Sequence, residues 1–242
     1  MEEIIKIAAV VVATTIGFTI AGVAGFGGGV VALPVVIWVF GVREAIPILA
    51  ISQLLSTASR VWLHREGINW PVVRHFTLGA LPMSVLGSFF FISVDASVLV
   101  RILGVMMLLF VVYTWLPIGS NFTMKLWGFA PLGAVTGFGS AFLGLPGPFA
   151  AVFFLAYGLS ASPYVGTFAL GMTLIQVVKL IIFSTSDLLT IKVLLLGLGL
   201  GAIGVVTAYL GRLILQRVPE KVFPRIITAM LLVSGIMLLI RG

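Results

Sequence analysis

Long apolar segments follow one another along almost the whole chain, and they restrict its fold more than any other feature. Charged residues make up only 9% of the 242 residues. The apolar segments are 4–40, 45–63, 76–94, 98–116, 122–158, 163–183, 193–211 and 226–240. Most of them reach the ~20 residues that a membrane-spanning helix needs. We therefore expect an all-α integral membrane protein, a polytopic helical bundle with about 8–10 hydrophobic segments.

Composition also excludes several classes of protein. A transmembrane barrel would show short strands of alternating polarity, and none are visible here. The net charge of +7 comes from Lys and Arg residues that lie mostly between the apolar segments, where they set membrane topology, so we expect no nucleic-acid partner. The chain has no cysteine and no HExxH, GxSxG or Walker sequence. We expect no enzymatic activity, no cofactor and no metal site.

The acidic residues avoid the apolar segments, which argues against a carboxylate proton relay. They are Glu2, Glu3, Glu44, Glu66, Asp95, Asp187 and Glu220. The two histidines, His64 and His75, belong to a basic connection. We expect both to be solvated or to contact lipid headgroups.

An internal repeat divides the chain into two halves, 1–118 and 119–242. A shift of 112 residues places "GFGGGVVALP", which begins at Gly25, over "GFGSAFLGLP", which begins at Gly137, with five of ten positions identical. The basic connection of the first half has a nearly neutral counterpart in the second, and the reverse holds for the next connection. By the positive-inside rule, the sequence predicts two inverted repeats, a common construction of secondary transporters.

The glycine-rich motifs predict a helix break at membrane depth in each half. Irregular backbone persists there only where it is buried in protein or lines a wet cavity, and glycine permits the unusual angles. We expect the second half-helices to begin near Gly28 and Ser140, with free N–H groups forming an anion site. Pro34 and Pro146 would then kink or cap these half-helices. The alternative is that the glycines only let helices pack closely.

Polar side chains at helical spacing interrupt one apolar segment in each half. They are Ser52, Gln53, Ser56 and Arg60 in the first half, and Thr173, Gln176 and Lys179 in the second. Each stripe presents an amide, hydroxyl groups and a cation, a set that suits an oxyanion. The alternative is that the hydroxyl groups join helices and the cations extend to the headgroups.

The two glycine motifs, with "RVWLHREGINW" between them, resemble those of the TauE/SafE family of sulfite exporters, also called the four-toluene sulfonate uptake permease family. The resemblance covers nearly the whole chain. It implies transport of sulfur-containing anions across the cytoplasmic membrane of a bacterium or archaeon. The motif positions are Gly25, Phe26, Gly27, Gly28 and Gly29, then Gly137, Phe138 and Gly139. The second copy departs from the first at Ser140, whose hydroxyl could add a donor.

These observations together predict a secondary transporter that exports a small sulfur-containing anion by alternating access. Sulfite, thiosulfate and organosulfonates such as sulfoacetate are the expected cargo. The alternatives are a passive anion channel, a transporter of another small organic anion, and a membrane-embedded structural subunit. Apart from the anion, the lipid bilayer is the expected partner, and the oligomeric state is left open.

Overall fold

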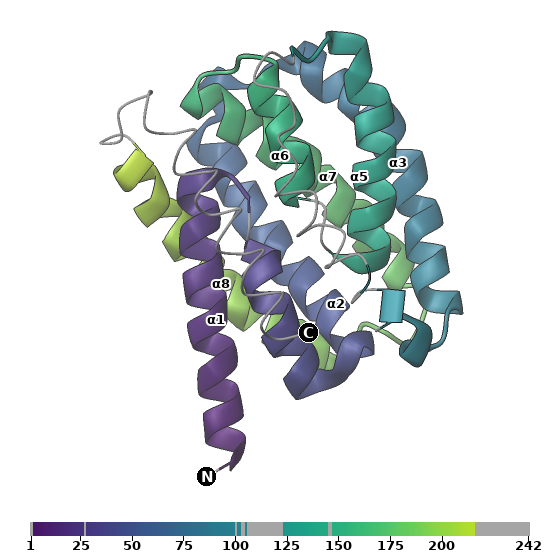
Figure 1. The fold of residues 1–242 in the computed structure, drawn as a ribbon. Helices are drawn as coiled ribbons and strands as arrows, with labels where there is room; N and C mark the ends of the chain where they lie inside the picture. Colours follow the sequence, from purple (N-terminus) through teal and green to yellow (C-terminus); the bar gives the residue numbers. More distant parts are fainter. Residues whose placement is uncertain are drawn as a thin grey trace.

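The computed structural model describes residues 2–26, 28–99, 101–102, 105, 123–144 and 147–215. Helices account for most of this part of the chain, and it contains no strand. The helices are α1 (Glu2–Ala24), α2 (Gly28–Leu63), α3 (Trp70–Ser93), α5 (Phe129–Leu143), α6 (Gly147–Ala156), α7 (Ala161–Phe183) and α8 (Ile191–Leu215), with two short 3-10 turns, η1 (Arg65–Gly67) and η2 (Leu126–Gly128) (Figure 1). The predicted all-α architecture is confirmed.

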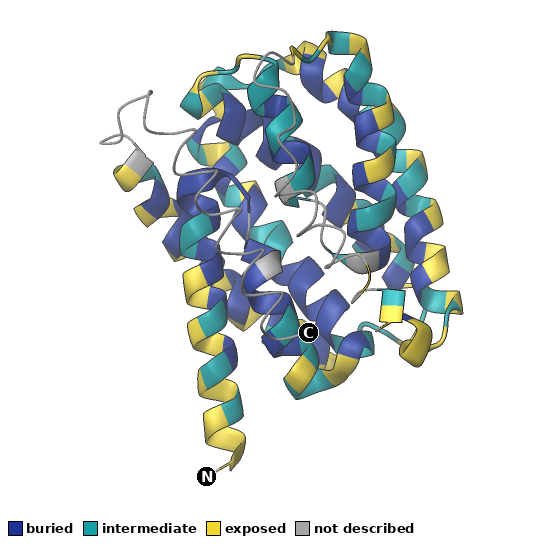
Figure 2. Ribbon diagram, viewed as in Figure 1, coloured by how far each residue is buried: buried dark blue, intermediate teal, exposed yellow. Residues whose placement is uncertain are grey.

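Five of the described helices are long and apolar enough to cross a membrane, and they are α1, α2, α3, α7 and α8. Their outward faces expose large apolar side chains such as Leu78 of α3 and Tyr209 of α8. Buried residues gather toward the inside of the bundle, and exposed residues follow the outer helix faces and the helix ends (Figure 2). This pattern is the one that a polytopic membrane protein requires. The expected segment 226–240 and most of 98–116 lie outside the described residues.

One group of helices runs in a single direction: α1, the second part of α2, and α8. The contacts that set this direction pair Ile51 with Gly197, Leu55 with Gly201, Phe18 with Gly204 and Gly22 with Gly211. In each pair of helices the residue numbers rise together, so the helices are parallel. Glycines at these positions let the helices approach closely, because a Cβ on Gly201 or Gly204 would meet the neighbouring side chain.

The remaining long helices, α3, α5 and α7, run in the opposite direction. Parallel contacts within this group pair Gly79 with Ala130, Gly87 with Phe138, Phe76 with Gly171 and Phe91 with Phe183. Where the two groups meet, α2 and α7 are antiparallel, because His64 contacts Ser162 and Gln53 contacts Gln176. The bundle thus has two sets of three helices pointing in opposite directions.

Four glycines with positive φ angles interrupt the helices in a repeating order. Gly25 (φ 83°) ends α1, and Gly41 (φ 73°) divides α2 into two parts. Gly144 (φ 75°) ends α5, and Gly158 (φ 86°) separates α6 from α7. Each half of the chain therefore contains a helix, a break, a short helix, a second break and a long helix. Gly25 and Gly144 are 119 residues apart, and Gly41 and Gly158 are 117 apart.

The first predicted break is confirmed and the second is in a different place. α2 begins at Gly28 as expected, but α5 continues through Gly137, Gly139 and Ser140, so a half-helix beginning near Ser140 is wrong. Gly137 serves close packing instead, because a Cβ there would lie 2.8 Å from the Cα of Ala80 in α3. The second break comes at Gly144, and the next short helix begins at Gly147.

The two prolines of the motifs have separate outcomes. Pro34 lies inside the first part of α2, and the backbone of that helix departs from helical angles at Gly41 rather than at the proline. Pro146 and Gly27 lie outside the described residues, as does the boundary between the halves at 118 and 119.

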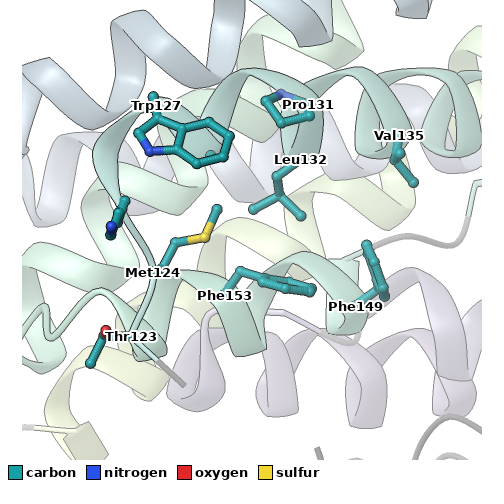
Figure 3. A pocket seen from close by; sticks show the side chains of 10 residues that line it. Thr123, Met124, Trp127, Pro131, Leu132, Val135, Phe149 and Phe153 are labelled. Carbon is teal, nitrogen blue, oxygen red and sulfur yellow. The ribbon is translucent and has the colours of Figure 1, made fainter. Parts of the chain in front are cut away.

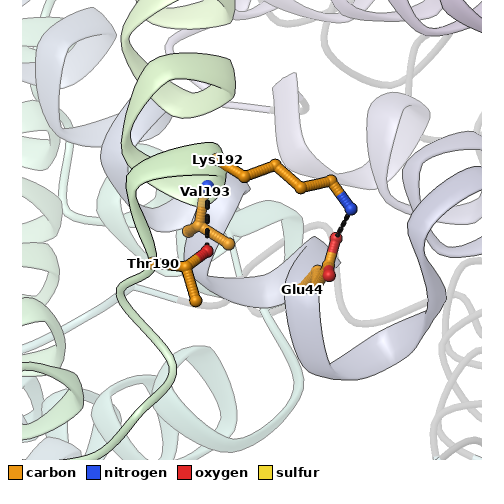
Figure 4. A network of polar contacts seen from close by, with 4 residues as sticks. All are labelled: Glu44, Thr190, Lys192 and Val193. Atoms are coloured by element: carbon orange, nitrogen blue, oxygen red, sulfur yellow. Dashed lines mark hydrogen bonds and ion pairs between the residues drawn. The ribbon is translucent and has the colours of Figure 1, made fainter.

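Polar contacts at one end of the bundle hold the break at Gly41 against neighbouring helices. Glu44 accepts a hydrogen bond from Lys192 at the start of α8, with the two charged atoms 2.7 Å apart (Figure 4). The guanidinium of Arg43 donates to the carbonyl groups of Phe91, Ile92 and Val94 at the end of α3. These carbonyl groups have no partner within their own helix, so Arg43 caps α3.

The positive φ angles predict that replacing one of these glycines with alanine lowers the free energy of unfolding. Replacing Gly158 with alanine should destabilise the protein by about 1–2 kcal/mol, because an L side chain is strained in this conformation. A Cβ at Gly158 would meet nothing within 4 Å, so no clash contributes. The matched control is Gly199→Ala in α8, where space is equally open and φ is not positive. Thermal unfolding in detergent measures both variants, and a Gly158→Ala protein as stable as Gly199→Ala would contradict the expectation.

Candidate functional site

The two breaks at Gly25–Gly28 and Gly144–Gly147 lie against each other inside the bundle. A Cβ on Gly29 would be 3.4 Å from the carbonyl oxygen of Gly144. A Cβ on Gly147 would be 3.6 Å from the Cβ of Phe26, whose side chain is buried. Segments almost 120 residues apart in sequence therefore bring the first turns of two short helices together. N-terminal turns of helices carry free N–H groups and a partial positive charge.

Arg60 joins the second part of α2 to the first break. Its side chain is 4% exposed, and its Nη1 donates to the carbonyl oxygens of Ala21 at 3.0 Å and Gly25 at 2.5 Å. Its Nε donates to the carbonyl oxygen of Ser56 at 3.2 Å. The backbone N–H of Gly25 also donates to the carbonyl oxygen of Ala21 at 2.9 Å, so Arg60 adds a second donor there. Arg60 also places a positive charge at the end of α1, where it opposes the helix dipole.

Lys179 makes an equivalent contact near the end of α5. Its side chain is 1% exposed, and its Nζ donates to the carbonyl oxygen of Ser140 at 3.0 Å. The separation between Arg60 and Lys179 is 119 residues, and the separation between the two acceptors, Ala21 and Ser140, is also 119. This value equals the separation of Gly25 and Gly144, so cation, acceptor and break recur together.

Two glutamines connect the halves between these cations. Nε2 of Gln176 in α7 donates to Oε1 of Gln53 in α2 at 3.1 Å. A Cβ on Gly29 would be 2.6 Å from Nε2 of Gln53, so the amide lies directly over the start of α2. Oε1 of Gln176 is buried and has no partner among the described residues. The predicted amides therefore meet at the place where the two breaks face each other.

The cations lie on opposite sides of this glutamine pair. Because α2 and α7 are antiparallel, residues that follow Gln53 and residues that follow Gln176 extend toward opposite ends of the bundle. Arg60 lies about 10 Å beyond Gln53 along its helix axis, and Lys179 about 4.5 Å beyond Gln176, at 1.5 Å per residue. A small molecule at the glutamines would have one cation toward each face.

The predicted hydroxyl groups divide into two kinds. Ser52 and Thr173 donate to carbonyl oxygens of their own helices, those of Ile48 and Ala169, and are occupied there. The hydroxyl of Ser56 is buried with no partner in the described part of the chain. Phe138 turns toward α3, where its ring lies 5.7 Å from that of Phe90. Phe138 and Gly137 are therefore helix-packing residues, which is the alternative that the sequence also allowed.

No buried carboxylate balances the two buried cations among the described residues. Arg60, Lys179 and the uncharged ring of His64 are the buried ionisable groups with nitrogen atoms. The acidic residues that the structure describes lie at helix ends and connections, and its ion pairs, Lys6–Glu2 and Lys192–Glu44, lie there as well. Removing a charge from water carries a large free-energy cost unless it is paired. Backbone carbonyl dipoles offset part of that cost, and an anion would offset the rest.

A cavity of about 490 Å³ lies elsewhere, between α5 and α6 near η2 (Figure 3). Its walls include Met124, Trp127, Leu132, Phe149 and Phe153. These side chains are apolar, Thr123 and Lys125 are the polar residues of the lining, and none of the predicted site residues lines the cavity. The cavity is mostly apolar and is separate from the polar centre.

Residues 9–238 match the model of a family described as "Sulfite exporter TauE/SafE". The chain belongs to this family. No curated protein and no solved structure matches the chain. The protein is thus a multi-pass membrane protein of a transporter family whose members are described as sulfite exporters.

Two residues of this family member lie at the site without having been predicted there. The ring of Tyr164 is fully buried against the first break, since a Cβ on Gly25 would be 2.8 Å from its Cε1. His64 is 5% exposed, so its expected solvated position is wrong. Its Nδ1 lies 2.9 Å from the hydroxyl oxygen of Ser162 in α7. The spacing of four residues from Arg60, along the predicted polar stripe, was the available signal for His64.

Burial of the His64 ring, together with the guanidinium groups of Arg212 and Arg60, lowers its pKa from the usual 6.5 to about 4. The unfolded chain therefore binds more protons than the folded protein between these values, and stability should fall as the pH drops from 6.5 toward 4. Replacing His64 with glutamine removes this contribution.

Thermal unfolding of the purified protein at stepped pH measures the effect. The wild type should lose stability more steeply than His64→Gln below pH 6.5. The variant His75→Gln, which changes the histidine at the start of α3, should keep the wild-type slope. Equal slopes for wild type and His64→Gln would contradict the assignment of a buried neutral imidazole.

Proposed function

We propose that this protein exports a small sulfur-containing anion across the cytoplasmic membrane of a bacterium or archaeon, by alternating access around a site between Arg60 and Lys179. One observation carries the proposal: two cations are buried at matched helix breaks without a buried carboxylate in the described part of the chain. An anion is the ligand that such a site lacks. Family membership supports a sulfur anion as the cargo.

The chemistry of the site fits an oxyanion with several acceptor oxygens. Sulfite, thiosulfate and the sulfonate group each present sulfur-bound oxygens and no donor when ionised. The donors are the side chains of Arg60 and Lys179, the amide groups of Gln53 and Gln176, and the N–H groups at the starts of α2 and α6. Arginine can present two donors to one oxyanion, which makes it suited to such a group.

Alternating access is supported by the direction of the helices. Under the proposed inverted repeat, α1 would correspond to α5, the second part of α2 to α7, and α3 to α8. The members of each pair run in opposite directions, as an inverted repeat requires. The two breaks are 119 residues apart, and so are the two cations, which supports the same correspondence. This separation replaces the shift of 112 residues expected from the glycine motifs.

The membrane potential is the proposed driving force. A cell interior at negative potential expels an anion with about 2.3 kcal/mol per charge for each 100 mV. The lack of buried carboxylates in the described residues favours this mechanism over proton coupling through acidic side chains. The basic connection at Arg65 and Arg74 would face the cytoplasm, from which the anion is taken.

Removing a buried cation of the site should reduce the transport current, whereas removing an exposed cation should not. In proteoliposomes, Arg60→Gln and Lys179→Gln should each lower sulfite-driven current by about tenfold or more, because a buried anion loses a charge-assisted partner. The matched controls are Arg65→Gln and Lys192→Gln, which remove exposed cations at the two ends of the bundle. These controls should keep at least half of the wild-type current, an approximate bound set by screening of exposed charges. Currents are recorded on a solid-supported membrane after addition of sulfite, sulfoacetate, thiosulfate, sulfate or chloride.

The same recordings distinguish the alternatives. A transporter gives a current that saturates with anion concentration and shows counterflow, whereas a passive channel gives neither. Currents with a different small organic anion alone would assign another cargo. If Arg60→Gln and Lys179→Gln carried wild-type currents, the proposed site would be wrong even though the family were right.

A further inference from the structure

His64 directly follows α2, four residues beyond Arg60. Its backbone N–H donates to the carbonyl oxygen of Arg60 at 3.0 Å, and its ring lies between α2 and the start of α7. A Cβ on Gly166 of α7 would be 3.0 Å from the Cβ of His64, so only glycine lets the two helices approach this closely. The ring is thus buried between Arg60 and the end of the bundle that carries the basic connection with Arg65 and Arg74. We call this end the basic end.

One ring nitrogen of His64 is buried without a partner. Nδ1 lies 2.9 Å from the hydroxyl oxygen of Ser162, but Nε2 has no partner among the described residues. Buried polar atoms are rarely left unpaired, so an orphan at a polar site indicates a missing ligand. If the Ser162 hydroxyl donates to Nδ1, the proton of the neutral imidazole must be on Nε2. His64 then presents a free N–H donor.

The charged groups around this nitrogen are cationic. Arg60 faces it from α2 and Arg212 from α8, and both are close enough to act on its charge. The end of α8 packs on the end of α1, since Gly211 lies directly on Gly22. Tyr164 of α7 is a further buried titratable residue, and it lies against the break that Arg60 contacts. Glu66, two residues after His64, is exposed, and no acidic residue of the described part is buried. The two charges that act on the ring are therefore both positive.

The position that matches His64 at the opposite end of the bundle has no such donor. At the separation of 119 residues, the counterpart of His64 is Phe183, which is fully buried. Its ring packs on Phe91 with the centroids 5.2 Å apart. The cation nearest to this ring pair in the described contacts is Arg43, 5.5 Å from the Phe91 ring, and it already donates to the carbonyl groups at the end of α3. One turn beyond Lys179 the structure therefore has an aromatic pair, whereas one turn beyond Arg60 it has an imidazole with an unused nitrogen. The two ends differ in chemistry although the breaks and cations match.

We propose that His64 is the first anion contact on the basic side: its Nε2–H, with the guanidinium groups of Arg60 and Arg212, binds a sulfur oxyanion before it reaches the glutamine pair. This inference rests on the proposed function and adds a residue that sets affinity at one face. A neutral donor holds the anion without a third positive charge. The anion is therefore bound firmly enough to enter and weakly enough to move on.

Three substitutions of His64 separate the donor from the ring. Glutamine places an amide N–H near the position of Nε2 and keeps the donor. Asparagine reaches only to the position of Nδ1, so it keeps a partner for Ser162 and removes the donor. Phenylalanine keeps the ring shape, removes both nitrogens, and reproduces the residue that stands at position 183.

The measurement is the half-saturating sulfite concentration in proteoliposomes sorted for one orientation. The basic side is the side of the connection with Arg65 and Arg74. With sulfite added there, His64→Asn and His64→Phe should raise the half-saturating concentration about tenfold, the effect of one hydrogen bond to a charged group. His64→Gln should stay within about twofold of wild type. With sulfite added on the other side, all three should match wild type. His75→Asn, a histidine change at the start of α3, is the control and should match wild type on both sides.

The outcomes distinguish a failure of this inference from a failure of the proposed function on which it rests. An unchanged half-saturating concentration in folded His64→Asn, or an equal loss in His64→Gln, would overturn the donor role. A wild-type protein that carries no sulfur anion would instead overturn the proposed function. If His64→Asn does not fold, Ser162→Ala takes its place. That change frees Nδ1 to hold the proton and should raise the value about threefold on the basic side only, and no rise would overturn the inference.

Discussion

The hydrogen bonds from two buried cations to broken helix ends are the interaction on which this structure depends. In a bilayer, a carbonyl group released from a helix has no water to replace its lost partner. Arg60 donates to Ala21 and Gly25, and Lys179 donates to Ser140. Ala21 and Ser140 also accept from the backbone N–H groups of Gly25 and Gly144, so the cations add a second donor and a positive charge at the ends of α1 and α5. The breaks that create the polar centre are stabilised by the same groups that give it a positive charge.

This double use suggests how binding and motion are coupled. Under the proposed function, an anion that enters the centre would compete with the backbone carbonyl groups for the same cations. If Arg60 turned to the anion, the end of α1 would lose one hydrogen-bond donor, and the balance between helix arrangements would change. Gln53 and Gln176 connect α2 and α7 at this point, so a shift of one helix would act on the other. Cargo binding and helix rearrangement would then be one event.

Much of the fold could be predicted from the sequence, because membrane solvation leaves few alternatives. Apolar segments of sufficient length must be helices, and the break at Gly25–Gly28 follows from glycines that interrupt one of them. The second break was placed too early because glycine has two uses in a membrane. Gly137 permits close packing on α3, whereas Gly144 adopts the positive φ angle. The amino-acid sequence alone does not distinguish these two roles of glycine.

The residue types of the proposed site could be read from the sequence, but their hydrogen bonds could not. The stripe with Gln53 and Arg60 and the stripe with Gln176 and Lys179 do meet the breaks, yet the cations bond to backbone carbonyl groups, which no side-chain pattern reveals. His64 was misjudged because its sequence neighbours are charged and mostly exposed, while the helices that bury it come from the other half of the chain. Such burial depends on long-range packing.

The most direct test of the central claim is to locate the anion. Selenite is an analogue of sulfite whose selenium scatters anomalously, so a crystal of the protein with selenite would mark the anion by its anomalous peak. We expect a peak beside Gln53 and Gln176, between Arg60 and Lys179. A peak in the apolar cavity near Trp127, or at the surface alone while sulfite is still transported, would contradict it.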